Sequence, residues 1–446
     1  MKRRLLLIRA GFERGEGRPY KARVLMEPLG VAVLAALTPS DWDIKFFDDR
    51  CERTPMDESA DLVAISTCTF SAIRAYQLAD HYRSRGIPVI LGGYHPTLVP
   101  DEAQVHADAI VLGDADEIWP ILLRDLDTGK LQPRYGEAGV PPRIGIRPDR
   151  SIFTKRYLPI HMIQFGRGCR SRCDFCAIRA FYGPGYAHRA IEDVVDEIRE
   201  AGSRRVFFVD DNLMTKVAVF KDLMRALIPL KVRWSTQIDM GCADDPEVLA
   251  LMQASGCQSL TIGIESLHDG TLARMAKGWN HTGDYEAQLA RLREAGIMVY
   301  GCFVFGYPHD TAETFLETAQ WALDQKLFLA NFMPLMPLPG TPLYARLVRE
   351  GRLVCHDWWK DPRFRWLDSL VIPENMSPED LSRGCRAARR IFNSPRGILA
   401  RLWKAPHHTR SLDNLLVYLM ANVLGRRDRK AKYLAMDSVS TAPGVR

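Results

Sequence analysis

Three cysteines lie close together in a short polar segment and could bind a metal centre. Cys169, Cys173 and Cys176 have the spacing C-x3-C-x2-C and directly follow a largely apolar run. Thiolates bind zinc and iron–sulfur clusters, and a cluster held by only three of them keeps one iron open for another ligand. A zinc site would need a fourth ligand, such as His188 or Cys242. The spacing alone predicts a metal centre and leaves an open cluster, a zinc knuckle and a chance grouping as alternatives.

The composition is that of an ordinary globular protein and restricts the classes of function. The chain has 446 residues, of which 47% are hydrophobic and 26% are charged, so it can bury more than one core. Its ten cysteines show no regular even framework, which argues against a disulfide scaffold and favours a reducing cytoplasm. No stretch approaches the roughly eighteen uncharged apolar residues of a membrane span. The net charge of +6 is not gathered into one long run, so no nucleic-acid partner is expected.

Residues 1–135 are predicted to form repeated strand–helix units. Short apolar runs predict the strands, and apolar residues at three- and four-residue spacing predict the helices, as in a doubly wound, Rossmann-like α/β domain. The predicted strands are 4–8, 44–48, 62–66, 88–92 and 109–112, and the predicted helices are 29–37, 71–85 and 117–126. Ligands of such folds bind beyond the carboxyl ends of the strands. The candidate ligand-binding residues there are Glu27, Ser66, Thr67, Gly92, Gly93, His95, Gly113 and Asp114.

A second series of strand–helix units follows a linker at 136–158 that is rich in Pro, Gly and Arg. The predicted strands are 162–165, 206–209, 232–237, 259–264, 299–305 and 328–334, and the predicted helices include 190–201, 246–255, 281–295, 312–325 and 342–350. Six such units predict a partial (β/α)6 barrel over 159–350, with its active site at the carboxyl ends of the strands. The polar residues at two of these ends are Asp210, Asp211 and Asn212, and Glu265 and Ser266.

The cysteine motif, with Phe175 directly before its third cysteine, resembles the motif of radical S-adenosylmethionine (SAM) enzymes. The strand-end residues of the first domain, in their order and spacing, resemble the cobalamin-binding domain found ahead of many such enzymes. The resemblance extends to about residue 345. It implies a 4Fe–4S cluster on Cys169, Cys173 and Cys176, SAM on the open iron, and cobalamin against the strand ends. The D-x-H-x-x-G pattern that supplies an axial histidine to cobalt elsewhere is absent.

The resemblance also implies roles for residues of the barrel. Asp210 and Asp211 would approach the amino group of SAM or the substrate, although Asn212 could equally cap a helix beside a solvated acid pair. Glu265 and Ser266 belong to a Gly-Ile-Glu-Ser segment that would reach the ribose and carboxylate of SAM. The catalytic candidates are therefore Asp210, Asp211 and Glu265, and the SAM-binding candidates are Phe175, Asn212, Glu265 and Ser266.

The implied reaction begins when one electron enters the cluster and cleaves SAM to methionine and a 5′-deoxyadenosyl radical. The radical abstracts a hydrogen from the substrate, which then takes a methyl group from methylcobalamin that a second SAM regenerates. We expect methylation of an unactivated carbon in a small molecule, either lipid-like or pigment-like, with an external one-electron reductant such as a flavodoxin or ferredoxin. Cyclisation or rearrangement with the same cofactors is an alternative, as is a cobalamin-binding sensor or carrier with a structural cluster.

Residues 351–446 are predicted to form a C-terminal helical region. The segment 396–404 is basic and aromatic, and a helix of this kind can lie on a membrane surface. In that case the protein would be a cytoplasmic one that associates peripherally with the membrane. The alternative is a helical cap packed on the barrel with a solvated basic face.

Overall fold

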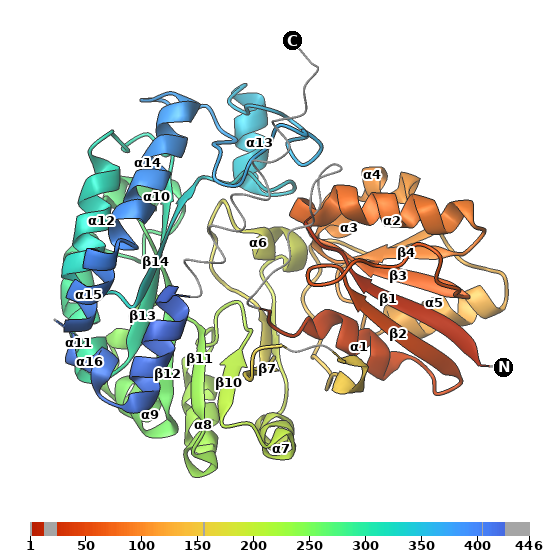
Figure 1. The fold of residues 1–446 in the computed structure, drawn as a ribbon, viewed down its shortest axis with the longest axis horizontal. Coiled ribbons are helices and arrows are strands. Elements are labelled where there is room, and N and C mark those ends of the chain that lie inside the picture. Colours follow the sequence, from red (N-terminus) through yellow and green to blue (C-terminus); the bar gives the residue numbers. More distant parts are fainter. Residues whose placement is uncertain (1, 13–24, 155–156, 404, 424–446) are drawn as a thin grey trace.

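The computed structural model describes residues 2–12, 25–154, 157–403 and 405–423. Two α/β domains lie side by side, with the N-terminal domain at the right of Figure 1 and the second domain at the left. Each domain is built on its own six-stranded sheet. Within the described residues, no helix is both long and apolar enough to cross a membrane.

The N-terminal domain is a doubly wound parallel sheet, as predicted. Its strands run in the order β2-β1-β3-β4-β5-β6, so the order reverses beside β1, which is where such folds bind ligands. Leu6 and Ile8 of β1 join the buried cluster on one face of the sheet, and Leu5 and Leu7 join the cluster on the other. The elements are β1 (Arg3–Arg9), α1 (Leu29–Leu37), β2 (Trp42–Asp48), β3 (Leu62–Ser66), α2 (Ala72–Ser84), β4 (Val89–Gly92), α3 (Tyr94–Leu98), α4 (Pro100–Val105), β5 (Ala109–Leu112), α5 (Ile118–Asp127) and β6 (Arg134–Gly136).

The second domain is a partial barrel of six parallel strands in the order β14-β13-β12-β11-β10-β7, again as predicted. One continuous buried cluster fills the space between the strands and the helices outside them. Its strands are β7 (His161–Ile163), β10 (Arg205–Phe208), β11 (Arg233–Gln237), β12 (Cys257–Glu265), β13 (Met298–Phe305) and β14 (Leu329–Pro334). Its helices are α7 (Ile191–Ala201), α8 (Val217–Leu227), α9 (Pro246–Ser255), α10 (Asp269–Arg274), α11 (Tyr285–Glu294), α12 (Thr314–Asp324) and α13 (Pro342–Arg349).

A small insertion between β7 and α7 was not predicted. It consists of β8 (Gly166–Gly168), α6 (Ala177–Tyr182) and β9 (Tyr186–His188), and β8 pairs with β9 in antiparallel fashion. Figure 1 shows α6 between the two domains. Strands of three residues carry no alternating pattern, so only the pairing in the folded chain reveals them.

The C-terminal region differs from the prediction of a wholly helical segment. Residues 353–371 form a strap without a helix, closed by a bridge between Leu353 and Val371. Trp358, Trp359 and Phe364 of this strap are buried in a cluster of the N-terminal domain. The strap therefore ties the end of the barrel back to the first domain. It is followed by α14 (Pro378–Phe392), α15 (Pro395–Trp403), α16 (Pro406–Thr409) and helical residues 412–423.

We expect Trp358→Ala to lower the free energy of unfolding by about 3–5 kcal/mol, because a fully buried indole leaves a cavity when it is removed. Trp403→Ala, at an exposed position, should change it by less than about 0.5 kcal/mol. Urea unfolding followed by tryptophan fluorescence measures both changes. Equal changes in the free energy of unfolding would show that the strap does not hold the two domains together.

Candidate active site and cofactor cavities

The cysteine loop forms the turn from β8 to α6. Cys169 directly follows β8, and Cys176 is the residue that caps the start of α6. Backbone N–H groups donate to two of the sulfurs: that of Ser171 lies 3.5 Å from Cys169 Sγ, and those of Ile178 and Arg179 donate to Cys176. Such donors favour thiolates. A half-buried set of three thiols with amide donors fits an iron–sulfur cluster, whose sulfurs are commonly hydrogen-bonded.

The two residues considered as a fourth zinc ligand are engaged elsewhere. Cys242 is fully buried in the core of the barrel. His188 lies on β9, and its Nδ1 is 3.0 Å from the carbonyl oxygen of Arg189. Among the described residues, no three His, Cys, Asp or Glu side chains converge on a site for a single metal ion.

Asp210 and Asp211 hold the chain that leads into the cysteine loop. The buried Asp210 carboxylate accepts hydrogen bonds from the backbone N–H groups of Phe165, at 3.0 Å, and Gly166, while Asp211 Oδ2 accepts one from Gly168 at 2.8 Å. Burial raises the pKa of Asp210 to about 8 and that of Asp211 to about 6, against the effect of these amides. The structure thus assigns both side chains to the backbone behind the cluster loop. A contact with SAM or substrate stays a prediction.

Glu265 forms a buried ion pair at the end of β12. It adopts a positive φ of 66°, which is unusual for this residue type. Its carboxyl group lies beside Gly263, two residues earlier in the strand. Glu265 Oε1 lies 2.9 Å from Nζ of Lys277, which also donates to the carbonyl oxygen of Gly263 at 2.6 Å. Burial raises the pKa of Cys173 to about 12, and the Lys277 ammonium opposes that shift. The pair therefore lies next to the cysteine loop, and Lys277 joins the candidate site.

The other two SAM-binding candidates of the strand ends are held in turns. Ser266 is buried, and its Oγ accepts a hydrogen bond from the N–H of His268 at 3.1 Å. Asn212 Oδ1 accepts from the N–H of Met214 at 3.2 Å, and its Nδ2 donates to Asp239 Oδ2 at 2.9 Å. No helix begins there, because α8 starts only at Val217, so the alternative of a helix cap was wrong.

A hollow of about 450 Å³ opens beside the cysteine loop at the carboxyl ends of β10 and β11. Its lining includes Arg170, Arg172, Asn212, Asp239 and Trp279. Phe175 lies on the other side of the loop and packs against the core of the barrel. Asn212 therefore borders the open space beside the cysteine loop.

A second cavity, of about 350 Å³, lies at the carboxyl ends of the N-terminal strands. Six of the eight candidate ligand-binding residues line it: Ser66, Thr67, Gly92, Gly93, Gly113 and Asp114. The opposite wall comes from the second domain and includes Gln164, Arg167, Phe181 and Tyr182. The residues that flank the cysteines on both sides thus form one wall of this cavity.

The remaining two candidates are not among the described residues that line this cavity, so a contact of either one with cobalamin stays a prediction. Glu27 Oε2 accepts a hydrogen bond from Arg150 Nε at 3.1 Å, and Glu27 is not among the described residues that line the cavity. His95 is fully buried, with Nε2 2.9 Å from Oη of Tyr76, and its ring packs against Trp359 of the strap. The observed contacts of His95 thus connect the N-terminal domain to the strap.

The cavity has features that fit cobalamin, whose corrin ring carries amide side chains. Asp116 Oδ1 is buried and finds no hydrogen-bond partner among the described residues, although Asp116 lines the cavity. An amide N–H of a ligand would satisfy this acceptor. Gly93 has a φ of 103°, and a Cβ there would lie 2.5 Å from the carbonyl oxygen of Thr67, so only glycine fits. No histidine is among the described lining residues.

Comparisons with known proteins identify both domains. The model of the B12 binding domain matches residues 20–123, and the model of the radical SAM superfamily matches residues 163–322. The chain is 30% identical over 393 residues to the bacteriochlorophyllide d C-12(1)-methyltransferase of Chlorobaculum tepidum, with 85% of each chain covered. It is 29% identical over 358 residues to the hopanoid C-2 methylase of Rhodopseudomonas palustris, with 74% of this chain and 66% of that one covered.

A solved structure shares the whole fold. The radical SAM methyltransferase TsrM from Kitasatospora setae, solved with cobalamin and a 4Fe–4S cluster, superimposes with a TM-score of 0.68. The alignment covers 97% of this chain and 99% of that chain at 18% identity. The chain belongs to the cobalamin-dependent radical SAM methyltransferases, and its cofactors are a 4Fe–4S cluster, SAM and cobalamin. The predicted fold class, enzyme class and cofactors are confirmed.

We expect Gly92→Leu to weaken cobalamin binding at least about tenfold, because the new side chain would occupy space in the cavity. A Cβ at Gly92 meets only Val111, at 3.8 Å, so the fold should tolerate it. Gly283→Leu, at an exposed position of the barrel, is the control. Absorbance titration with hydroxocobalamin measures affinity, and unchanged affinity in the folded variant would place the cofactor elsewhere.

We expect Asp210→Asn to reduce the iron bound after anaerobic reconstitution by more than half. The amide NH₂ would face the backbone N–H of Phe165 or Gly166, and a buried unmatched donor costs about 1–3 kcal/mol. Asp222→Asn, on the exposed face of α8, should bind iron normally. If the Asp210 variant kept its iron and lost only SAM binding, its role would be the SAM contact predicted from the sequence.

Proposed function

We propose that this enzyme methylates an unactivated carbon of an apolar, polycyclic small molecule of the tetrapyrrole class. The observation that carries this proposal is the shared wall between the two sites. Arg167 and Tyr182 lie on either side of the cysteines in the chain, and both line the cobalamin cavity. A methyl donor in that cavity and a cluster on the loop would therefore face the same small space, where the substrate carbon must also lie.

When bound, the cluster and cobalamin supply reductive cleavage of SAM and a methyl group for transfer. The protein's own residues bind, orient and shield these reactants. Cys169, Cys173 and Cys176 hold the cluster, and the backbone bonds of Asp210 keep the loop in place. The tilted ring pair of Tyr94 and Phe181, with centroids 4.7 Å apart, closes the cavity wall and excludes water.

We also propose that the barrel residues around the hollow receive SAM. Asn212 reaches this hollow, and Glu265 and Ser266 end the neighbouring strand β12. Glu265 and Lys277 form a neutral pair there that leaves Glu265 Oε2 available for a hydroxyl donor. Phe175 supports the loop from the core side.

The substrate class rests on the relatives. One of them is named for a bacteriochlorophyllide and another for a hopanoid, which are both polycyclic and largely apolar. The electron enters from an external one-electron donor of the flavodoxin or ferredoxin class. Arg170 and Arg172 are exposed beside the half-buried cysteines, and their positive charges would attract an acidic protein of that kind.

Reconstituted enzyme, supplied with a one-electron reductant and methyl-labelled SAM, should transfer the label to a bacteriochlorophyllide. Each product should be accompanied by one S-adenosylhomocysteine and one 5′-deoxyadenosine, because the methyl group and the radical come from different SAM molecules. Omission of cobalamin should stop methylation and leave some cleavage of SAM. Formation of an unmethylated, rearranged pigment would contradict the proposal, as would normal methylation without cobalamin.

A further inference from the structure

The last described helical segment, residues 412–423, carries a row of apolar residues on the side that faces away from the protein. Its buried face carries polar residues that are hydrogen-bonded: Asn414 Nδ2 donates to the carbonyl oxygen of His407 at 3.0 Å, and Tyr418 Oη donates to that of Ile398 at 2.7 Å. The exposed residues at helical spacing on the other face are Leu412, Leu416, Leu419, Met420 and Val423. Val417, Tyr418 and Ala421 also pack against a small apolar cluster, so this segment carries apolar side chains on both faces. An ordinary surface helix presents a polar face to solvent instead.

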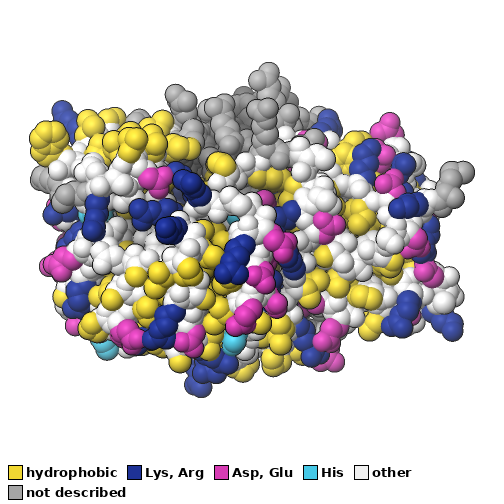
Figure 2. Space-filling view, turned by 90° about the horizontal axis from the view of Figure 1, so that it is seen from below, with side chains coloured by type: hydrophobic (Ala, Val, Ile, Leu, Met, Phe, Trp, Pro, Cys, Tyr) yellow, Lys and Arg dark blue, Asp and Glu magenta, His cyan; other side chains and the backbone are white. Residues whose placement is uncertain are grey.

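The neighbouring helix α15 continues this face. Trp403 is 92% exposed and Leu399 is 64% exposed, one turn apart on the same side of the helix. The bond from Tyr418 to Ile398 places α15 against the segment 412–423. Figure 2 shows apolar side chains gathered at the upper left, on the side of the C-terminal helices. We call Leu399, Trp403, Leu412, Leu416, Leu419, Met420 and Val423 together the apolar stripe.

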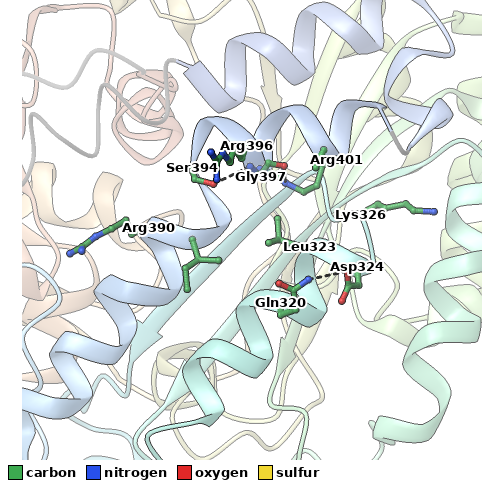
Figure 3. A pocket seen from close by; sticks show the side chains of 11 residues that line it. Gln320, Leu323, Asp324, Lys326, Arg390, Ser394, Arg396, Gly397 and Arg401 are labelled. Carbon is green, nitrogen blue, oxygen red and sulfur yellow. Dashed lines mark hydrogen bonds between the residues drawn. The ribbon is translucent and has the colours of Figure 1, made fainter.

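A cationic hollow of about 630 Å³ lies on the same helix α15, between α12 and α14. Figure 3 shows Lys326, Arg390 and Arg396 among the side chains that line it. None of these three cations has an ion-pair partner among the described residues, and the acid in the lining, Asp324, accepts a hydrogen bond from Gln320. Arg396 lies at the start of α15, on the same side of the helix as Trp403. The hollow and the apolar stripe are therefore next to each other.

We propose that this surface docks onto an anionic lipid bilayer. The apolar stripe would enter the boundary between headgroups and acyl chains, and Lys326, Arg390 and Arg396 would bind lipid phosphates. A second copy of the chain is a poorer partner, because a two-fold contact through this face would bring unpaired cations together.

The inference rests on the proposed apolar substrate, which a membrane-bound enzyme would receive from the bilayer. The helical cap foreseen as the alternative for this region is also present, since Arg401 of α15 is buried and donates to the carbonyl oxygens of Leu327 and Phe328 at 2.9 and 2.8 Å. One side of α15 thus packs on the barrel, and the other side carries the stripe.

Flotation of the full-length protein with vesicles tests this inference. The protein should float with vesicles of phosphatidylcholine and phosphatidylglycerol, much less with phosphatidylcholine alone, and less as salt rises. Leu416→Ser/Leu419→Ser should weaken binding at least about tenfold by removing buried apolar area. Arg390→Glu/Arg396→Glu should remove the preference for the anionic lipid. Val105→Ser/Ile144→Ser, which alters two apolar residues elsewhere that are even more exposed, is the matched control.

Two results would overturn the docking surface. The first is wild-type protein that does not float. If light scattering then shows a dimer that Leu416→Ser/Leu419→Ser dissociates, the stripe binds a second copy instead. The second is equal loss of flotation in the control variant. Methylation of a pigment in detergent, measured on the same variants, separates the two proposals, because it should survive the stripe substitutions even where vesicle binding is lost.

Discussion

The buried guanidinium of Arg167 joins the two cofactor domains. Its Nη1 lies 2.7 Å from Asp116 Oδ2 and 3.2 Å from Asp114 Oδ2, and Tyr182 Oη donates to Asp114 Oδ1 at 2.9 Å. Loss of one partner would leave an uncompensated buried charge, at a cost of about 3–5 kcal/mol. Because Arg167 lies just before the cysteine loop in the chain and Tyr182 ends α6, this network sets the distance between the cysteine loop and the cobalamin cavity.

Two further polar clusters fix the same arrangement from other directions. Arg150 of the linker donates to Glu27 of the first domain at 3.1 Å and to Glu197 of the barrel helix α7 at 2.7 Å. Glu102 of α4 meets the strap: burial opposes ionisation of its carboxyl group, but hydrogen bonds from His95 and from Lys360 and Trp359 of the strap outweigh burial and lower the pKa of Glu102 to about 2. Each cluster draws its members from segments far apart in the chain, so the domains hold one relative position.

That rigidity explains how a small number of side chains can serve difficult chemistry. The cofactors supply the reactive groups, and the protein must keep them at a constant separation in a space without water. Asp210 and Asp211 act on the backbone of the cysteine loop, and Glu265 and Lys277 compensate each other beneath it. The same constraint accounts for the glycines of the first domain, since Gly93 lets its backbone approach that of Thr67.

Local pattern alone predicted both sheets except for the short strand β6, most of their helices and the three cysteines, because apolar periodicity and motif spacing are properties of neighbouring residues. It also marked six of the residues that line the cobalamin cavity, since parallel strand ends share one edge of a sheet. Only the tertiary structure brought Arg167, Tyr182 and Asp116 into that cavity and left Glu27 and His95 out of its described lining. It alone showed the strap and the outward apolar stripe. These features depend on contacts between segments that are far apart in the chain. The local sequence does not show which buried carboxylate or imidazole forms a hydrogen bond with the other domain.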